Sequence, residues 1–227
     1  MTPKPRRALD LFTGTQSIAK WCRAHGFDEV VTLDIDPKAN ADHTCNIMDF
    51  DYKQYPRFYF EYVHASVPCT EYSIAKTTKP RDIEGANRIV LKTLEIIQWL
   101  APSVYTVENP ATSLLRKQTF MAMLPYTITD YCTFSTPETP FLYRKRTIWF
   151  TNRVATLVKL HPLCNGACAG IREPVPGAPE GRRTHAVSFG GQRGGQRGGK
   201  RFMLKSNVSM NQKHSIPPSL LDWLLLD

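Results

Sequence analysis

The chain opens with a short apolar segment ending in glycine, an amphipathic helix and a second apolar segment. Residues 7–14 (RALDLFTG) are typical of a buried strand that runs into a tight turn. Residues 17–25 carry apolar side chains at helical spacing, and Gly26 ends that helix. Residues 29–34 (EVVTLD) are predicted as a second strand. A strand, a helix and a strand in this order predict a parallel unit, which places the chain in the α/β class.

The later segments continue this alternation. Further strands are predicted over 60–66, 104–107 and 147–151, and a helix over 86–100. We therefore predict a doubly wound, mainly parallel sheet. In such sheets the ligand-binding residues gather at the carboxyl ends of the strands. The residues predicted at this edge are Gly14, Asp34, Cys69 and Glu108.

Gly14 and Asp34 together indicate a cofactor site. Gly14 lets the backbone approach a ligand closely, just before a helix N-terminus with free N–H groups. Asp34 follows 20 residues later, where a carboxylate can hold both hydroxyls of a ribose. The three-glycine pattern of dinucleotide sites is absent from the sequence, which argues against NAD. A cofactor with a ribose and no pyrophosphate fits better, and S-adenosylmethionine is the candidate.

Cys69 and Glu108 are the candidate reactive residues. Cys69 lies in a polar loop (ASVPCTEYS, residues 65–73), which argues against a buried packing role for this cysteine. A cysteine thiolate is a strong nucleophile. Glu108 comes 39 residues later, after the predicted strand 104–107. It could cap a helix, but its place at the mouth of a buried strand favours a carboxyl group that hydrogen-bonds a base.

Positive charge is concentrated in the C-terminal third. Residues 1–152 hold 18 Lys/Arg and 16 Asp/Glu, whereas residues 153–227 hold 11 and 4. This asymmetry indicates a polyanionic partner, although ordinary solvated surface is the alternative. Residues 190–199 repeat a Gly-Gly-Gln-Arg unit, which is typical of a flexible segment that could grip phosphates or act as a plain linker.

The sequence indicates an intracellular protein. It contains no apolar run long enough for a membrane span, and its N-terminus does not lead into a signal peptide. Six cysteines scattered over 227 residues do not resemble a secreted disulfide framework, so we expect reduced thiols.

Histidines and cysteines of the C-terminal third have spacing that could bind zinc. The candidate ligands are His161, Cys164, Cys168 and His185. A tetrahedral zinc site would stabilise a segment too small for a core of its own. The alternative is a loop that contains these residue types and binds no metal.

Several motifs, in the correct order, resemble those of the cytosine-C5 DNA methyltransferases. The cofactor motifs are Asp10-Leu-Phe-Thr-Gly14 and Leu33-Asp-Ile-Asp-Pro37, and the catalytic ones are Pro68-Cys69, Glu108-Asn109 and Arg144-Lys-Arg146. The resemblance covers residues 8–152, with a weaker match at 216–220 (IPPSL).

The resemblance implies methyl transfer from S-adenosylmethionine to C5 of cytosine in DNA. Cys69 would attack C6 of a flipped-out cytosine, and Glu108 would bind its N3 and exocyclic amine. Arg144 and Arg146 would help to hold the base and the adjacent backbone. The cofactor pocket would be lined by Phe12, Gly14, Asp34, Ile35 and Asn46.

The chain also departs from the family pattern. Thr70 stands where the family usually has Gln, Pro110 where it has Val, and Asn46 where an Asp is common. The resemblance implies a Rossmann-like catalytic and cofactor-binding core over residues 1–152. A small, basic, partly flexible region like a reduced target-recognition domain would span 153–210, and a helix in 211–227 would return to the core.

Two alternatives follow from these departures. The chain could be a catalytically silent, nucleic-acid-binding homologue, or it could methylate RNA or a free cytosine nucleotide at C5. A partner subunit could supply the missing recognition surface.

Overall fold

Strands alternate with helices or short 3₁₀ turns through the first two thirds of the molecule. The computed structural model describes residues 4–77, 79–136, 143–159, 163–164, 186–187 and 215–226. The strands of the main sheet are β1 (Arg7–Leu11), β2 (Glu29–Asp34), β3 (His43–Thr44), β4 (Tyr62–Ser66), β5 (Val104–Pro110), β6 (Tyr126–Asp130) and β8 (Arg146–Thr151). A separate pair is formed by β7 (Tyr143–Arg144) and β9 (Ala186–Val187).

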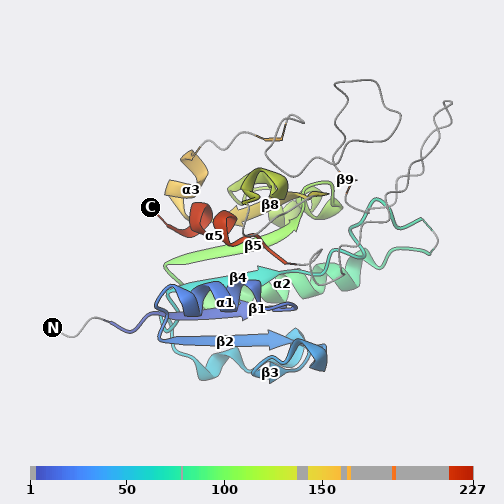
Figure 1. Ribbon diagram of the computed structural model, residues 1–227. Helices are drawn as coiled ribbons and strands as arrows, with labels where there is room; N and C mark the ends of the chain where they lie inside the picture. Colours follow the sequence, from blue (N-terminus) through green and yellow to red (C-terminus); the bar gives the residue numbers. More distant parts are fainter. Residues whose placement is uncertain are drawn as a thin grey trace, which may run out of the picture.

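Helices cover both faces of the main sheet (Figure 1). They are α1 (Ser17–Ala24), α2 (Ile83–Leu100), α3 (Val154–Val158) and α5 (Pro218–Leu225). The 3₁₀ turns are η1 (Pro37–Ala39), η2 (Ile47–Asp49), η3 (Tyr52–Gln54), η4 (Leu114–Lys117), η5 (Thr119–Met121) and η6 (Tyr131–Phe134). None of the helices in the described ranges is long and apolar enough to cross a membrane.

The sheet has the order β3-β2-β1-β4-β5-β8-β6. The first five strands in this order are parallel, and β8 is antiparallel to both of its neighbours. The chain therefore moves outward from β1 to β3 and then returns to β4 on the other side of β1. This reversal confirms the predicted doubly wound, mainly parallel sheet. Its switch point, where such folds bind ligands, lies at the carboxyl ends of β1 and β4.

Two hydrophobic clusters, one on each face, hold the helices to the sheet. Leu9, Val63 and Val107 belong to the cluster that includes Val90 and Ile96 of α2. The other cluster joins strand residues to α1 and α5 and includes Ala8, Tyr62, Trp149, Trp21 and Leu220. Neighbouring strand residues thus enter opposite clusters, because side chains alternate across a sheet.

The long helix α2 begins at a capping residue. The side chain of Asp82 accepts a hydrogen bond from the N–H of Gly85 at 2.8 Å, which satisfies a helix donor that would otherwise lack a partner. Such a cap typically contributes about 1 kcal/mol. The helix therefore starts three residues before the predicted position at Ala86.

The C-terminal helix α5 packs against α1, on the face of the sheet where Ala8 of β1 is buried (Figure 1). The indole Nε1 of Trp21 donates to Asp222 Oδ1 at 2.8 Å across 201 residues of sequence. The short helix α3 also joins the core, since Thr156 Oγ1 donates to the carbonyl of Leu224 at 2.6 Å. The core therefore continues past the predicted boundary at residue 152, through α3.

Candidate active site at the carboxyl edge of the sheet

The loop that carries Cys69 and the strand that carries Glu108 lie side by side. β4 and β5 are parallel, and Ser66 is the register partner of Glu108. Cys69 follows three residues after the end of β4 and is half-buried. The side chain of Asn109 fixes this arrangement, because its Nδ2 donates to the carbonyl of Val67 at 2.9 Å. The nucleophile and the carboxylate predicted from sequence are thus brought to the same edge of the sheet.

The sequence predicted Glu108 just beyond the end of its strand. The structure places Glu108 inside β5, because the strand continues to Pro110. The residue is 7% exposed. Its Oε1 lies 3.3 Å from Nζ of Lys145, yet the geometry does not make a hydrogen bond. Within the described residues this buried oxygen has no hydrogen-bond donor. The ion pair compensates its charge, and the oxygen can still accept a hydrogen bond from a ligand.

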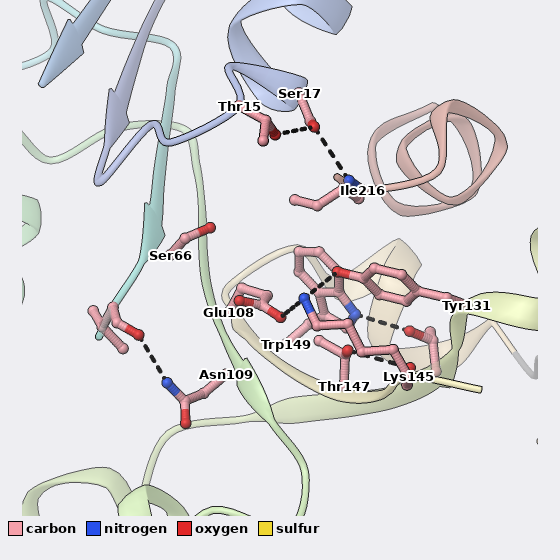
Figure 2. A network of polar contacts seen from close by, with 12 residues as sticks. Thr15, Ser17, Ser66, Glu108, Asn109, Tyr131, Lys145, Thr147, Trp149 and Ile216 are labelled. Carbon is pink, nitrogen blue, oxygen red and sulfur yellow. Dashed lines mark hydrogen bonds and ion pairs between the residues drawn. The ribbon is translucent and has the colours of Figure 1, made fainter. Parts of the chain in front are cut away.

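Lys145, rather than Arg146, faces Glu108 (Figure 2). The antiparallel pairing of β5 with β8 sets Glu108 opposite Trp149. Side chains alternate along a strand, so Thr147 and Lys145 lie on the same face as Trp149. Arg146 belongs to the other face. The sequence prediction missed Lys145 because the register of β8 against β5 was not available to it.

Arg146, one of the two predicted arginines, forms an ion pair with a buried aspartate. Its Nε and Nη2 donate to the two carboxylate oxygens of Asp130 at 3.0 and 2.8 Å. Asp130 is fully buried, so this bidentate ion pair ties β8 to β6. The structure therefore shows Arg146 joining β8 to β6, and its predicted contact with a base stays a prediction. The side chain of Arg144, the other predicted arginine, lies outside the described residues.

Lys145 is held over the ring of Tyr131. Its Nζ lies 4.8 Å from the ring centroid and 3.5 Å from the phenolic oxygen. Burial raises the pKa of Tyr131, so the phenol stays neutral. A neutral aromatic ring favours the ammonium group without cancelling its charge. Lys145 thus brings a positive charge next to Glu108.

Opposing influences act on the thiol of Cys69. Burial raises its pKa most strongly, and the negative charge of Glu108 raises it further, while the positive charge of Lys145 lowers it. The thiol is therefore mainly protonated near neutral pH. Reaction as a nucleophile requires a change that favours the thiolate.

A buried histidine, which the sequence analysis did not single out, lies beneath the site. His64 is fully buried in β4, with Nδ1 at 2.8 Å from Thr106 Oγ1 and Nε2 at 2.8 Å from Ser66 Oγ. Burial, assisted by the charge of Lys145, lowers the pKa of His64 to about 3. The ring is neutral under ordinary conditions and supports the strand ends without adding a charge.

The second group of predicted residues surrounds the turn after β1. Phe12 and Gly14 both have left-handed backbone geometry, with φ of 59° and 46°. The N–H of Gly14 donates to Asp34 Oδ2 at 2.9 Å, and the N–H of Asp36 donates to Asp34 Oδ1 at 2.9 Å. The turn after β1 is therefore joined to the end of β2 through the carboxylate of Asp34.

Two exposed apolar side chains lie in the segments that follow β2 and β3. Ile35 is 64% exposed and Met48 is 46% exposed. Asn46 holds the second of these segments, because its Oδ1 accepts the N–H of Met48 at 3.0 Å and caps η2. Exposed apolar groups in segments that follow the strand of a carboxylate suit a ligand with a flat ring attached to a ribose. All five predicted cofactor residues thus lie in segments at the ends of β1, β2 and β3.

Asp10, a buried residue of β1, holds this turn through a hydrogen bond from Thr13. It is 1% exposed, and its Oδ2 accepts the hydroxyl of Thr13 at 2.5 Å. Burial raises the pKa of Asp10 to about 7, against the opposing effect of hydrogen bonds from Thr13 and the backbone of Ala19. The C-terminal segment reaches the same turn, since the N–H of Ile216 donates to Ser17 Oγ at 3.2 Å (Figure 2).

The structure gives the predicted zinc site no support. Cys164 is buried, and its backbone N–H donates to Asp130 Oδ2 at 2.9 Å. The other three candidate ligands, His161, Cys168 and His185, lie outside the described residues. Within the ranges that the structure describes, no group of three or more His, Cys, Asp or Glu side chains could hold a metal ion.

Comparison with known proteins finds one similar over almost the full length. A protein of Frog virus 3 (isolate Goorha), named as a probable DNA (cytosine-5)-methyltransferase, is 28% identical over 234 residues, which cover 96% of this chain and 98% of that protein. The resemblance to cytosine-C5 DNA methyltransferases that the motifs indicate is thereby confirmed. No family model matches the sequence.

Similar solved structures share less of their length with this chain. The Dnmt2 methyltransferase of S. pombe is 17% identical with a TM-score of 0.44, covering 65% of this chain and 49% of its own. A putative DNA modification methyltransferase encoded within a prophage (E. coli) is 15% identical with a TM-score of 0.46, covering 64% and 46%. The chain thus spans about half the length of these two proteins.

Proposed function

We propose that this chain transfers a methyl group from S-adenosylmethionine to C5 of cytosine in DNA, through a covalent bond between Cys69 Sγ and C6 of the base. One observation carries the proposal. Cys69 and Glu108 lie at the ends of adjacent parallel strands, and a buried oxygen of Glu108 lacks a hydrogen-bond donor among the described residues. The full-length similarity to the viral protein, named as a probable cytosine-5 methyltransferase, supports it.

The residues around Asp34 fit S-adenosylmethionine. Each carboxylate oxygen of Asp34 accepts one backbone N–H and retains a lone pair for a ribose hydroxyl. Ile35 and Met48 offer exposed apolar surface for the adenine ring. The left-handed turn at Phe12 and Gly14 leaves the backbone open to the rest of the cofactor. When bound, S-adenosylmethionine supplies an electrophilic methyl group on a positively charged sulfur.

Cys69 would begin the reaction on a cytosine that has left the duplex. Its thiol would give its proton to solvent, and Sγ would form a bond to C6 while the electron pair of the C5–C6 double bond moves to C5. Glu108 would hold the electron-rich ring, with one oxygen donating a proton toward N3 and the other accepting from the exocyclic amine. Extruding the base costs a few kcal/mol, which these contacts offset.

C5 would then form a bond to the methyl carbon as the sulfur–methyl bond of the cofactor breaks, which leaves S-adenosylhomocysteine, and C5 would afterwards lose its proton to solvent. The electron pair left by this proton restores the C5–C6 double bond and expels Cys69 as a thiolate. The nucleophile is thereby regenerated, and no oxidant or reductant is needed.

Positive charge beside the site suits DNA as the partner. Lys79 and Arg81 are exposed in the loop that follows Cys69, where they can contact phosphates. The region from residue 153 onward adds 11 Lys/Arg against 4 Asp/Glu. These contacts would provide affinity, whereas sequence choice requires side chains that reach base edges.

Methyl transfer from radiolabelled S-adenosylmethionine tests the proposal. Double-stranded DNA, RNA and dCMP are offered separately, and bisulfite sequencing of the DNA identifies the modified position. We expect label in DNA, at C5 of cytosine. Label in RNA or dCMP alone would reassign the substrate, and transfer to none of the three would contradict the proposed activity.

A further inference from the structure

A chain of hydrogen bonds runs through the sheet from Tyr62 to the carboxyl end of β4. The phenolic oxygen of Tyr62 lies 2.6 Å from Thr106 Oγ1, which in turn lies 2.8 Å from Nδ1 of His64. On the other side of the imidazole ring, Nε2 lies 2.8 Å from Ser66 Oγ. Tyr62, His64 and Thr106 are buried, whereas Ser66 is half-buried at the edge of the sheet. The chain therefore joins the interior of the sheet to the candidate site.

The buried end of this chain decides which nitrogen of His64 carries the proton. Burial keeps the ring neutral, so one nitrogen donates and the other accepts. Among the described residues, the hydroxyls of Tyr62 and Thr106 bond only to each other and to Nδ1. A proton on Nδ1 would leave one of these two buried hydroxyl donors without an acceptor, which is costly.

A proton on Nε2 satisfies every donor of the chain. Tyr62 then donates to Thr106, Thr106 donates to Nδ1 of His64, and Nε2 of His64 donates to Ser66 Oγ. Ser66 thus accepts a hydrogen bond from His64 and keeps its own O–H as a donor. In the part of the chain that the structure describes, this O–H has no acceptor. A ligand or water can therefore accept it.

Ser66 faces the candidate site from the strand between the two groups of site residues. It is the register partner of Glu108 on β5, and paired residues of neighbouring strands point to the same face of a sheet. On its other side β4 pairs with β1, whose turn leads to Thr15. Figure 2 shows Ser66 between Glu108 and this turn.

The proposed cofactor must pass this position. Asp34, which fits the ribose, ends β2, and β1 separates β2 from β4 in the sheet. A cofactor that holds its ribose at Asp34 and presents its methyl group beside Glu108 therefore crosses the end of β1. Its amino-acid portion is attached to the same sulfur as the methyl group, so it lies near the end of β4, where Ser66 stands.

The amino-acid portion carries a carboxylate, which can only accept hydrogen bonds. The free O–H of Ser66 is a donor of the required kind. Thr15 and Ser17 add another, because their oxygens lie 3.0 Å apart and only one of their two O–H groups is used in the bond between them. Ser17 Oγ also accepts the N–H of Ile216, which holds this pair in place.

We propose that Ser66, held as a hydrogen-bond donor by His64, binds the carboxylate of the methionine portion of S-adenosylmethionine. His64 is then a positioning residue that acts through Ser66. The identity of the ligand rests on the function proposed above, whereas the proton on Nε2 of His64 does not. Contacts at Asp34 and at Ser66 would fix both ends of the cofactor and so direct its methyl group toward Glu108.

Two ligands that differ only in the carboxylate test the contact with Ser66. They are S-adenosylhomocysteine and its decarboxylated form, and isothermal titration calorimetry measures the affinity of each for wild type, Ser66→Ala and Ser66→Thr. We expect Ser66→Ala to weaken binding of S-adenosylhomocysteine about tenfold and to leave the decarboxylated ligand unchanged. Ser66→Thr keeps the hydroxyl and should retain both affinities. Equal losses for the two ligands, or no loss for either, would overturn the contact.

NMR of isotope-labelled histidine tests the role of His64 in wild-type protein without ligand, because protonated and unprotonated ring nitrogens have distinct chemical shifts. We expect the proton on Nε2, and a proton on Nδ1 would overturn the positioning role. His64→Leu should reproduce the carboxylate-selective loss of Ser66→Ala, and His64→Gln, whose amide can donate to Ser66, should restore affinity. If His64→Leu does not fold, the wild-type spectrum and the Ser66 variants still decide the question.

Methyl transfer separates this inference from the function proposed above. Wild-type protein that binds S-adenosylhomocysteine through Ser66 but methylates no cytosine would contradict that function and leave the contact standing. A Ser66→Ala variant that methylates DNA and binds S-adenosylhomocysteine as tightly as wild type would overturn the contact alone.

Discussion

Asn109 Nδ2 donates to the carbonyl of Val67 at 2.9 Å, so the strand that carries Glu108 is tied directly to the loop that carries Cys69. Asn109 and Val67 are 42 positions apart in sequence, and Asn109 is fully buried. The bond joins β5 to the residue that follows β4, at the edge of the sheet where Cys69 and Glu108 lie. Asn109 thus holds the loop of Cys69 against the strand of Glu108.

Replacing Asn109 by Ala should loosen the Cys69 loop. The lost hydrogen bond should lower the free energy of unfolding by about 1–2 kcal/mol and slow methyl transfer about tenfold, while cofactor affinity stays unchanged. Urea denaturation and single-turnover transfer measure the two effects.

Asn152 provides the matched control for Asn109. It accepts the N–H of Tyr105 at 2.8 Å and donates to the carbonyl of Ser103 at 3.1 Å, at the opposite end of β5. Asn152→Ala should cost similar stability and leave transfer by the folded protein unchanged. Equal losses of transfer in both variants would show that Asn109 has no particular link to the site.

Asp34→Asn should weaken S-adenosylmethionine binding by about 10- to 100-fold, since hydrogen bonds to a charged group contribute about 1.5–3 kcal/mol. Isothermal titration calorimetry measures the affinity. The control is Asp36→Asn, because Asp36 is an exposed neighbour whose side chain accepts from Lys38 N–H. Equal affinities for the Asp34 variant and wild type would remove Asp34 from the cofactor site.

Asp10 should make stability fall as pH rises from about 4 to about 7. Its pKa is raised to about 7 in the folded protein by burial, so the native state binds a proton more tightly than the unfolded chain. The stabilisation is complete below the unfolded pKa and is lost as pH rises through the folded one. The greatest slope is about 1.4 kcal/mol per pH unit.

Asp10→Asn should remove this slope. Urea denaturation at pH 5, 6, 7 and 8 measures the difference between the variant and wild type. Parallel curves for the two proteins would mean that Asp10 titrates normally in the fold.

Docking of α5 should contribute strongly to stability. Leu220 of α5 is fully buried against the other residues of its hydrophobic cluster. Leu220→Ala should therefore lower the free energy of unfolding by about 2–4 kcal/mol. Leu226, at 41% exposed, is the matched control and should change stability by less than about 0.5 kcal/mol on replacement by Ala. A small effect at Leu220 would show that the helix is not firmly packed.

The parallel half of the sheet could be predicted from sequence because its strands have strong local signals. The predicted strand 29–34 coincides with β2, and the predicted helix 17–25 ends one residue early as α1. β6 was not predicted, because its buried residues include Thr129 and Asp130, whose polar side chains hide the strand from a hydrophobic pattern.

The partner of Arg146 lies in this same unpredicted strand. Asp130 at the end of β6 forms an ion pair with Arg146. The register of β8 with β5 and β6 places Lys145 on the same face as Glu108. Neither fact is local in sequence. Cys69 and Glu108 were predictable together, because each follows a recognisable apolar segment and parallel strands end at a common edge.

The most direct test of the central claim is covalent trapping of Cys69 on DNA that contains 5-fluorocytosine, in the presence of S-adenosylmethionine. Fluorine at C5 cannot leave as a proton does, so the bond between Sγ and C6 should persist after methyl transfer. We predict a denaturation-resistant complex with wild-type protein, with the modification mapped to Cys69, and none with Cys69→Ser. Wild-type protein that gives no adduct, or an adduct that survives Cys69→Ser, would contradict the account.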